Sequence, residues 1–328
     1  MILVADIGGT KIAAARVGGD GALCSEIHQA PTPPEDAPAP DGTEPSASST
    51  WPPGEASASS TTFTTSAGGA ARVVDAVVEL LEGLRGPGDV GVAISAAGVV
   101  DVGAGRVLSS TSSIGGWGGT PLAERVSARV GLPVRVLGDG NAFGVGLAIE
   151  YGVPDLLALV AGTGIGGSLI LDGEPVLGAH HAGGHFGHVV SAEAAGMPCP
   201  CGRIGHLEAV ASGYGILAWY HANGGDPAVT TTRDLTRRTD ELARTALHTG
   251  GTALGAAAAG LVNAIDPRLV VVAGSVARAG EVWESALRTA YRDGLIPAVA
   301  ETPLEVSDGG AETALRGAAH YVMRRMKA

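Results

Sequence analysis

The fold of this chain is decided by the stretch ILVADIGGTKIAAARV, residues 2–17. An apolar run that ends in Asp6 is followed by the turn Gly8-Gly9-Thr10, and a second run of mostly small apolar residues begins at Lys11. Strand, glycine turn and strand predict a β-hairpin. A P-loop or a dinucleotide-binding loop would instead pass from a strand through glycines into a helix. Because the second run has neither a capping residue nor a helical apolar stripe, we exclude both of those loops.

A second stretch of the same kind, LLALVAGTGIGGSLIL, occupies residues 156–171. Its recurrence predicts two related half-domains. Backbone N–H groups of a tight glycine turn can converge on phosphate oxygens, and the hydroxyls of Thr10 and Thr163 would add donors. Asp6, at the end of its strand, could hold hydrated Mg²⁺ on those phosphates. Two such turns in one chain favour nucleotide-phosphate binding over the alternative of two ordinary hairpins.

Composition narrows the class of protein. The 328 residues are 45% hydrophobic, which is enough for a sizeable core. The formal net charge of −12 argues against binding to nucleic acid or to anionic lipid. The apolar runs are too short for a membrane helix, and residues 31–68, rich in Pro, Ser, Thr and Ala, predict a flexible surface insertion. We therefore expect a soluble, cytoplasmic α/β protein without a signal peptide.

Two acidic residues are candidates for chemistry. Asp139 follows an apolar strand at 134–137 and precedes a helix expected at 142–150. An accessible aspartate there could take a proton from an alcohol during phosphoryl transfer, or it could be the N-cap of the helix. Glu208 could bind a substrate hydroxyl, or it could lie in the first turn of a helix and favour the helix dipole. The residues alone leave both pairs of alternatives open.

The segment 188–206 has the residue types of a metal site. Soft thiolates and imidazoles suit Zn²⁺, which is four-coordinate in structural sites, and cysteines in a cytosolic protein favour a metal over a disulfide. The expected ligands are His188, Cys199, Cys201 and His206, with His180, His181 and His185 as substitutes for one of the histidines. The alternative is a loop with two free thiols. Cys24 stands apart, and its strand-like surroundings predict a buried side chain.

Several motifs together make the chain resemble the ROK family, named for repressors, open reading frames and sugar kinases. Residues 6–11 match the family's first phosphate motif, and residues 162–167 match its second. Asp-Gly-Asn at 139–141 resembles the catalytic Asp-x-Asn. The most specific match is the segment 184–213, which contains Cys-x-Cys-Gly-x-x-Gly and then Leu-Glu-Ala at 207–209. Gly-Gly-Trp at 115–117 and Ala-Gly-Ser at 273–275 are further similarities, and the resemblance covers nearly the whole chain outside 31–68.

The resemblance implies two actin-like, ribonuclease H-like α/β lobes with a cleft between them and a zinc-binding loop. The smaller lobe would comprise residues 1–120 and about 308–328, and the larger lobe residues 121–307 with the zinc loop 188–206. The resemblance also implies an enzyme that transfers the γ-phosphate of ATP to the primary, 6-type hydroxyl of a hexose or a sugar-like acceptor. Homodimers or homotetramers are the expected assemblies.

Roles follow from the resemblance residue by residue. Asp139 would be the general base. ATP would be held by Asp6, Gly8, Gly9, Thr10, Lys11, Thr163, Gly164 and Gly274. The acceptor would be bound by Gly98, Ser113, Gly138, Asp139, His185, His188 and Glu208. The zinc loop would orient His188 and Glu208 towards the acceptor.

The acceptor side departs from the family pattern. Members usually have Glu at the position of His185, Asn at that of Gly138 and Asn at that of Ser113. Because the phosphate motifs and Asp139 are intact, we expect a working kinase with an unusual acceptor. An amino sugar of the kanosamine type or a C7-cyclitol is then the alternative to a common hexose such as glucose. A non-catalytic sugar sensor is less favoured, and so is a repressor, whose DNA-binding domain would precede a motif that here starts at residue 6.

Overall fold

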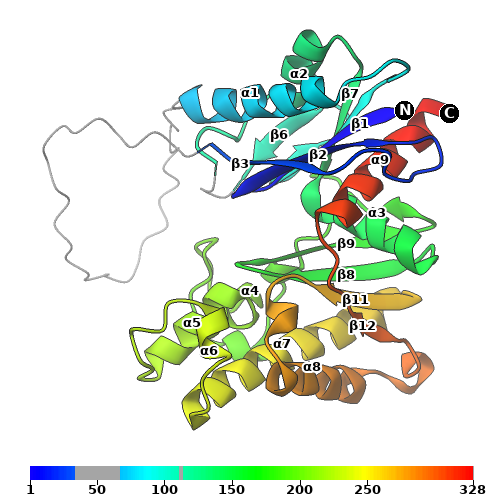
Figure 1. Cartoon of the computed structure of the whole chain (residues 1–328). Coiled ribbons are helices and arrows are strands. Elements are labelled where there is room, and N and C mark those ends of the chain that lie inside the picture. The colour runs from blue at the N-terminus through cyan, green and yellow to red at the C-terminus, as the bar shows by residue number, and fades with distance from the viewer. Residues whose placement is uncertain (34–66, 111–113, 328) are drawn as a thin grey trace, which may run out of the picture.

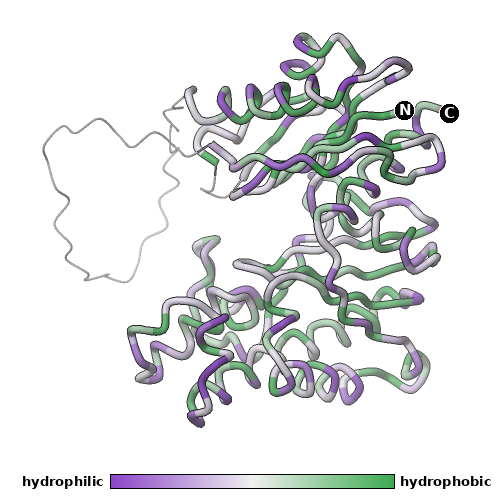
Figure 2. The backbone as a smooth tube through the Cα atoms, viewed as in Figure 1, coloured by the Kyte–Doolittle hydropathy of each residue, from purple (hydrophilic) through white to green (hydrophobic). Residues whose placement is uncertain are grey.

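A computed structural model describes residues 1–33, 67–110 and 114–327. The described chain forms two α/β lobes, one above the other in Figure 1, each built around a five-stranded sheet. Both termini lie close together at the edge of the upper lobe. Figure 2 shows apolar residues gathered along the central strands, with polar residues alternating along the outer helices. None of the helices in the described ranges combines the length and apolar character that a bilayer crossing requires.

The first lobe contains the N-terminal hairpin. Its elements are β1 (Ile2–Ile7), β2 (Lys11–Val17), β3 (His28–Pro31), α1 (Ala67–Leu84), β4 (Val92–Ala96), β5 (Val99–Asp101), β6 (Arg106–Ser109), α2 (Leu122–Val130), β7 (Val134–Gly138) and α9 (Ala311–Lys327). The sheet order is β3-β2-β1-β4-β7, with the predicted hairpin closing where Ile7 pairs with Ile12. Successive side chains of a strand point to opposite faces. Leu3 therefore packs with α1 and α2, whereas Val4 packs with α9.

The second lobe repeats this order of pairings. Its elements are α3 (Asp139–Tyr151), β8 (Leu156–Ala161), β9 (Ile165–Leu171), β10 (Glu174–Pro175), α4 (Glu208–Ala211), α5 (Gly213–Ala222), α6 (Thr232–Leu235), α7 (Glu241–Ile265), β11 (Leu269–Ala273), α8 (Glu281–Gly294) and β12 (Leu304–Val306). The sheet order is β10-β9-β8-β11-β12. The β8–β9 hairpin is antiparallel and β11 runs parallel to β8, as β4 does to β1. The two glycine turns therefore occupy equivalent places in the two sheets.

The lobes meet where α3 packs against α9 (Figure 1). A Cβ atom on Gly146 would overlap the carbonyl oxygen of Thr313, and one on Gly317 would overlap a backbone oxygen of α3. These glycines allow the two helix backbones to approach more closely than side chains would permit. Strand β7 pairs with β4 of the first sheet. Strand β7 therefore belongs to the first sheet, whereas the lobe boundary expected from the resemblance lies before this strand, after residue 120.

The segment 31–68 begins inside the fold. Pro31 is the last residue of β3, and Thr32 is buried with its Oγ1 donating a hydrogen bond to the carbonyl oxygen of Gly8 at 2.7 Å. Helix α1 takes in the last two residues of the segment. The expected surface insertion is therefore shorter at both ends, and its remainder, 34–66, lies outside the described residues.

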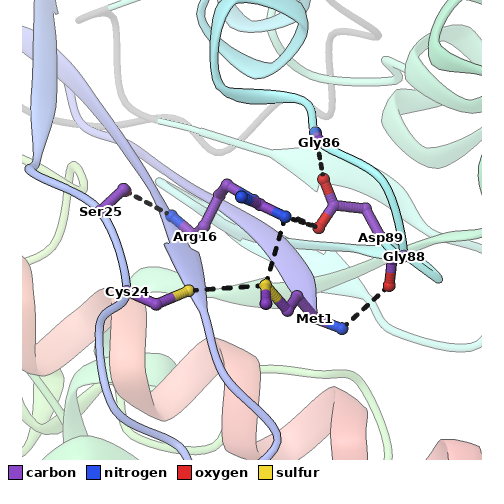
Figure 3. Close-up of polar contacts among 7 residues, drawn as sticks. All are labelled: Met1, Arg16, Cys24, Ser25, Gly86, Gly88 and Asp89. Atoms are coloured by element: carbon purple, nitrogen blue, oxygen red, sulfur yellow. Dashed lines mark hydrogen bonds and ion pairs between the residues drawn. The ribbon is translucent and has the colours of Figure 1, made fainter.

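A polar cluster ties the N-terminus to the first lobe (Figure 3). The Arg16 guanidinium lies 2.9 Å from the buried carboxylate of Asp89, and the amino group of Met1 donates to the carbonyl oxygen of Gly88 at 3.1 Å. The prediction of a buried Cys24 is wrong. Its side chain is exposed although its backbone N–H still donates to the carbonyl oxygen of Arg16 in β2 at 2.9 Å, and its Sγ lies 3.9 Å from the Met1 sulfur.

Candidate active site

The two glycine turns line one cavity of about 360 Å³ between the lobes, here called the phosphate-side cavity. Each turn is closed by a backbone hydrogen bond, from Gly8 N to Lys11 O at 3.0 Å and from Gly162 N to Gly164 O at 2.9 Å. The N-terminal end of α9 forms a further wall. Of the residues predicted to hold phosphates, those that line this cavity are Asp6, Gly8, Lys11, Thr163 and Gly164.

Asp6 is fixed at the end of β1 inside this cavity. Its Oδ1 accepts a hydrogen bond from the Ser95 hydroxyl at 2.6 Å, across the β1–β4 pairing. Burial raises the pKa of Asp6, while the Ser95 hydrogen bond and the positive charge of Lys11 oppose the rise. Two neighbouring residues that were expected to hold ATP do not line the phosphate-side cavity. Gly9 lines a second cavity, described below, and Thr10 lines neither of the two.

Asp139 lies at the junction of β7 and α3, as the sequence predicts. It is the first residue of the helix, and Gly138 occupies the N-cap, so the capping alternative does not describe it. Its Oδ1 accepts a hydrogen bond from the backbone N–H of Gly140 at 2.7 Å. The carboxylate is accessible from the cleft, yet the protein around it desolvates it. This desolvation, with the nearby negative charge of Asp6, raises the pKa of Asp139 to about 6.

A second cavity of about 450 Å³, the acceptor-side cavity, shares Asp139 with the first. It takes residues from both lobes. A Cβ on Gly98 would lie 2.5 Å from the carbonyl oxygen of Ser109, and its φ of 102° is one that glycine adopts readily. The predicted acceptor residues that line the cavity are Gly98, Gly138, Asp139, His185, His188 and Glu208. Ser113 lies outside the described residues.

The position of Glu208 is compatible with both of its alternatives. It is the first residue of α4 and it lines the acceptor-side cavity. It also has a contact that the sequence does not indicate, because its Oε2 accepts a hydrogen bond from the Ile165 backbone N–H at 2.8 Å. A Cβ on Gly164 would lie 2.5 Å from that oxygen. The carboxylate therefore links the second glycine turn to the acceptor side.

A third cavity, the nucleoside-side cavity, lies beyond the second turn in the second lobe and measures about 540 Å³. Gly274 leads into it with a φ of 100°, and a Cβ there would overlap the carbonyl oxygen of Ala161. Sequence reasoning missed most of its lining. The missed side chains include Tyr214, Thr230, Thr231, Thr232, Arg233 and Arg278. The short helix α6 carries two of them, Thr232 and Arg233, and its sequence offers no motif that marks a binding site.

The four predicted metal ligands come together in the loop between β10 and α4. The ligand atoms of His188, Cys199, Cys201 and His206 all lie within 4.8 Å of one another. Cys199 Sγ is 3.8 Å from His188 Nδ1, and Cys201 Sγ is 3.2 Å from His206 Nδ1. Burial raises the pKa of Cys199 to about 11, and desolvation lowers the pKa of His188. Imidazole binds metal when neutral, whereas the Cys199 thiolate would need a nearby cation.

A model of the ROK family matches residues 55–325 of the chain. The chain is 30% identical to a glucokinase of Thermotoga maritima over an alignment of 274 residues. This alignment covers 78% of this chain and 85% of the relative. It is also 30% identical over 280 residues to an N-acetylmannosamine kinase of Shigella flexneri, covering 84% of this chain and 83% of the relative.

Solved structures agree with this match. A ROK hexokinase from Thermus thermophilus superposes with a TM-score of 0.77 at 28% identity, covering 99% of both chains. A ROK family glucokinase from Streptomyces griseus, solved in complex with glucose and AMPPNP, superposes with a TM-score of 0.72 at 27% identity, again over 99% of both chains. These neighbours have the two-lobe actin-like fold, so the predicted fold class is confirmed.

Proposed function

Because the chain belongs to the ROK family, we propose that it transfers the γ-phosphate of ATP to the primary, 6-type hydroxyl of a hexose or sugar-like acceptor. Its relatives are named as sugar kinases, and a structural neighbour holds glucose and AMPPNP, so the chain is a sugar phosphotransferase. One observation carries the proposed chemistry: Asp139 lines both the phosphate-side and the acceptor-side cavity. A general base must reach the proton it takes, and this junction is where the two substrates would meet.

Transfer begins with Asp139 in its ionised form. The carboxylate takes the proton of the acceptor hydroxyl while the hydroxyl oxygen attacks the γ-phosphorus. The bond from that phosphorus to the bridging oxygen breaks, and ADP leaves with its electron pair. Backbone N–H groups of the glycine turns and the Lys11 ammonium stabilise the phosphate charges. Closure of the lobes excludes water and so limits wasteful ATP hydrolysis.

The remaining groups of the nucleotide fit the cavities beyond the turns. The phosphates lie between Gly8 and Thr163, and the nucleoside extends past Gly274 into the nucleoside-side cavity. The buried carboxylate of Asp6 faces the phosphate-side cavity, and carboxylate oxygen is a ligand that Mg²⁺ prefers, directly or through water. Gly9 and Thr10 stay predicted contacts of ATP.

The Cys₂His₂ cluster fits structural Zn²⁺. Two thiols and two imidazoles within 4.8 Å of one another are a donor set of four, as a tetrahedral site requires. When bound, zinc supplies a crosslink between distant parts of the loop 188–206. His188 Nδ1 faces Cys199, so its Nε2 is left for a hydrogen bond to the acceptor. Leu207 and Glu208 follow the last ligand directly, so the loop also places Glu208.

The acceptor is the finer part of the proposal. His185 Nδ1 donates to the carbonyl oxygen of Ala182 at 3.0 Å, so its Nε2 accepts hydrogen bonds in the neutral ring and keeps part of a carboxylate's role. Gly138 stands where family members usually have Asn, and it has no side chain that could replace the hydrogen bonds of that amide. A Cβ there would meet Asn141 and Gly98 at 3.6 Å, an ordinary contact distance, so the glycine leaves room beside Asp139. We expect glucose to be a poor acceptor, and a modified sugar or cyclitol with an exocyclic CH₂OH to be preferred.

The test is an ADP-release screen with glucose, kanosamine, N-acetylated hexosamines and C7-cyclitols, with product masses to confirm phosphorylation. We expect a higher kcat/KM for a modified acceptor than for glucose, and Gly138→Asn should shift the preference towards glucose. If glucose matches or exceeds every alternative, the acceptor part is wrong and the kinase stands. Sugar binding by calorimetry without turnover would favour a non-catalytic sensor.

Location and assembly complete the proposal. We place the kinase in the cytoplasm, where ATP and sugar substrates are present and thiols stay reduced for zinc. We expect a homodimer or homotetramer, which size-exclusion chromatography with light scattering would measure. Nucleic acid and membranes are not expected partners, given the net charge of −12.

A further inference from the structure

A contact between the lobes lies at the edge of the acceptor-side cavity. His181 Nε2 is 3.6 Å from Asp101 Oδ1. Asp101 ends β5, and its neighbour Val100 belongs to the core of the first lobe. His181 lies in the loop that follows β10 of the second sheet. Because His181 and Val100 both line the acceptor-side cavity, the pair connects its two walls.

The conformation of His181 shows that it is held in place. Its φ is 58°, in the left-handed region, which costs free energy for a residue with a Cβ. Its Nδ1 is buried and has no hydrogen-bond partner among the residues that the structure describes. Such features persist where surrounding contacts fix the residue. The fixing contacts are Asp101 and a backbone hydrogen bond from His181 N to Gly178 O at 3.3 Å.

We infer that His181 and Asp101 are positioning residues for the acceptor, because their contact pins the loop 178–185 to the first lobe. His185 lies in this loop and His188 follows it, so a shift of the loop would move these two further imidazoles of the acceptor-side cavity. Neither member of the pair lines the phosphate-side cavity, so ATP binding should not depend on it. The inference rests on the proposed function for its link to an acceptor.

Conservative variants isolate the side-chain contact. Asparagine tolerates a left-handed backbone, so His181→Asn removes the imidazole without adding strain. Asp101→Asn removes the charge while its Oδ1 can still accept from the Ala104 N–H. The matched control is Asp172→Asn, since Asp172 has a φ of 52° and lies in an exposed turn outside the three cavities.

Steady-state kinetics with the best acceptor of the screen is the first measurement. Both members of the pair are partly exposed, with side chains 27% and 31% accessible, so each single variant should raise the acceptor KM about 2- to 5-fold. The ATP KM should not change. The double variant should be no worse than either single one, because the two residues act through one contact. Additive effects, a parallel rise in the ATP KM, or an unchanged acceptor KM would overturn the inference.

Hydrogen–deuterium exchange of the intact chain is the second measurement, and it does not depend on turnover. Each single variant should speed exchange both in residues 99–109 and in residues 178–185, which belong to different lobes, and Asp172→Asn should change neither. Faster exchange only in the mutated segment would overturn the inference. If the wild type phosphorylates no acceptor, the proposed function fails, and this exchange pattern still decides whether the pair pins the loop.

Discussion

Lowering the pH from 8 to 5 should remove most of the transfer activity, because the proposed base becomes protonated. Desolvation, together with the charge of Asp6, raises the pKa of Asp139 to about 6. At that pKa about 99% of the carboxyl is ionised at pH 8 and about 9% at pH 5. We expect kcat/KM for the acceptor to fall about tenfold over this range with a one-proton slope. The assay is coupled ADP release at saturating ATP and constant ionic strength.

The control is Asp139→Asn, which should lower kcat on the order of 10²–10⁴-fold, the usual range for acid–base catalysis. Because the pKa of Asp139 is raised, the folded chain binds this proton more tightly than the unfolded chain, and ionisation above pH 6 opposes folding. The variant should therefore keep or raise the Tm at pH 8, so lost activity would not reflect unfolding. A wild-type profile that stays flat to pH 5, or a variant with near-normal kcat, would refute the assignment.

Three further predictions test other parts of the molecule. Elemental analysis should find about one zinc per chain. Cys201→Ser should lose the zinc, whereas His206→Cys should keep it, because thiolate is also a good zinc ligand. A wild-type protein without zinc, whose activity is unchanged after chelation, would contradict this prediction. Deleting residues 36–62 should leave Tm and activity near wild type, since loop length costs little, and a large drop in either would show a packed role. Gly164→Ala should raise the acceptor KM about 2- to 10-fold, because its Cβ would lie 2.5 Å from Glu208 Oε2 and push that carboxylate off the Ile165 N–H, whereas Gly166→Ala, with open space around it, should not.

The parts of the site that the sequence predicts are those fixed by local geometry. A glycine turn between two apolar runs determines its own hairpin, so the turns at Gly8 and Gly164 could be placed without knowledge of the rest of the chain. The metal ligands follow the same logic, because Cys199, Cys201 and His206 lie within one short loop. Only His188 is farther away, and one bridge between Val190 and His206 brings it back to the loop.

The parts that the sequence does not predict depend on long-range pairing. Strand β7 joins the first sheet through β4, some forty residues earlier in the chain, and no local pattern marks which sheet it enters. The lining of the nucleoside-side cavity cannot be predicted for the same reason, because Thr231 and Arg233 reach this cavity only through the packing of α6. Asp101 and His181 are 80 positions apart, and each is unremarkable by itself.

This division between local and long-range features also separates the two substrates. Phosphate would be held mainly by backbone N–H groups of the glycine turns, which a change of side chain cannot supply or replace. The acceptor site would be shaped by residues that three separate segments contribute, represented by Gly138, His185 and Glu208. A single substitution in any of these segments can alter the acceptor while Asp139 keeps its place between the cavities. We therefore expect acceptor preference to change by point substitution, and phosphoryl transfer from ATP to persist through such changes.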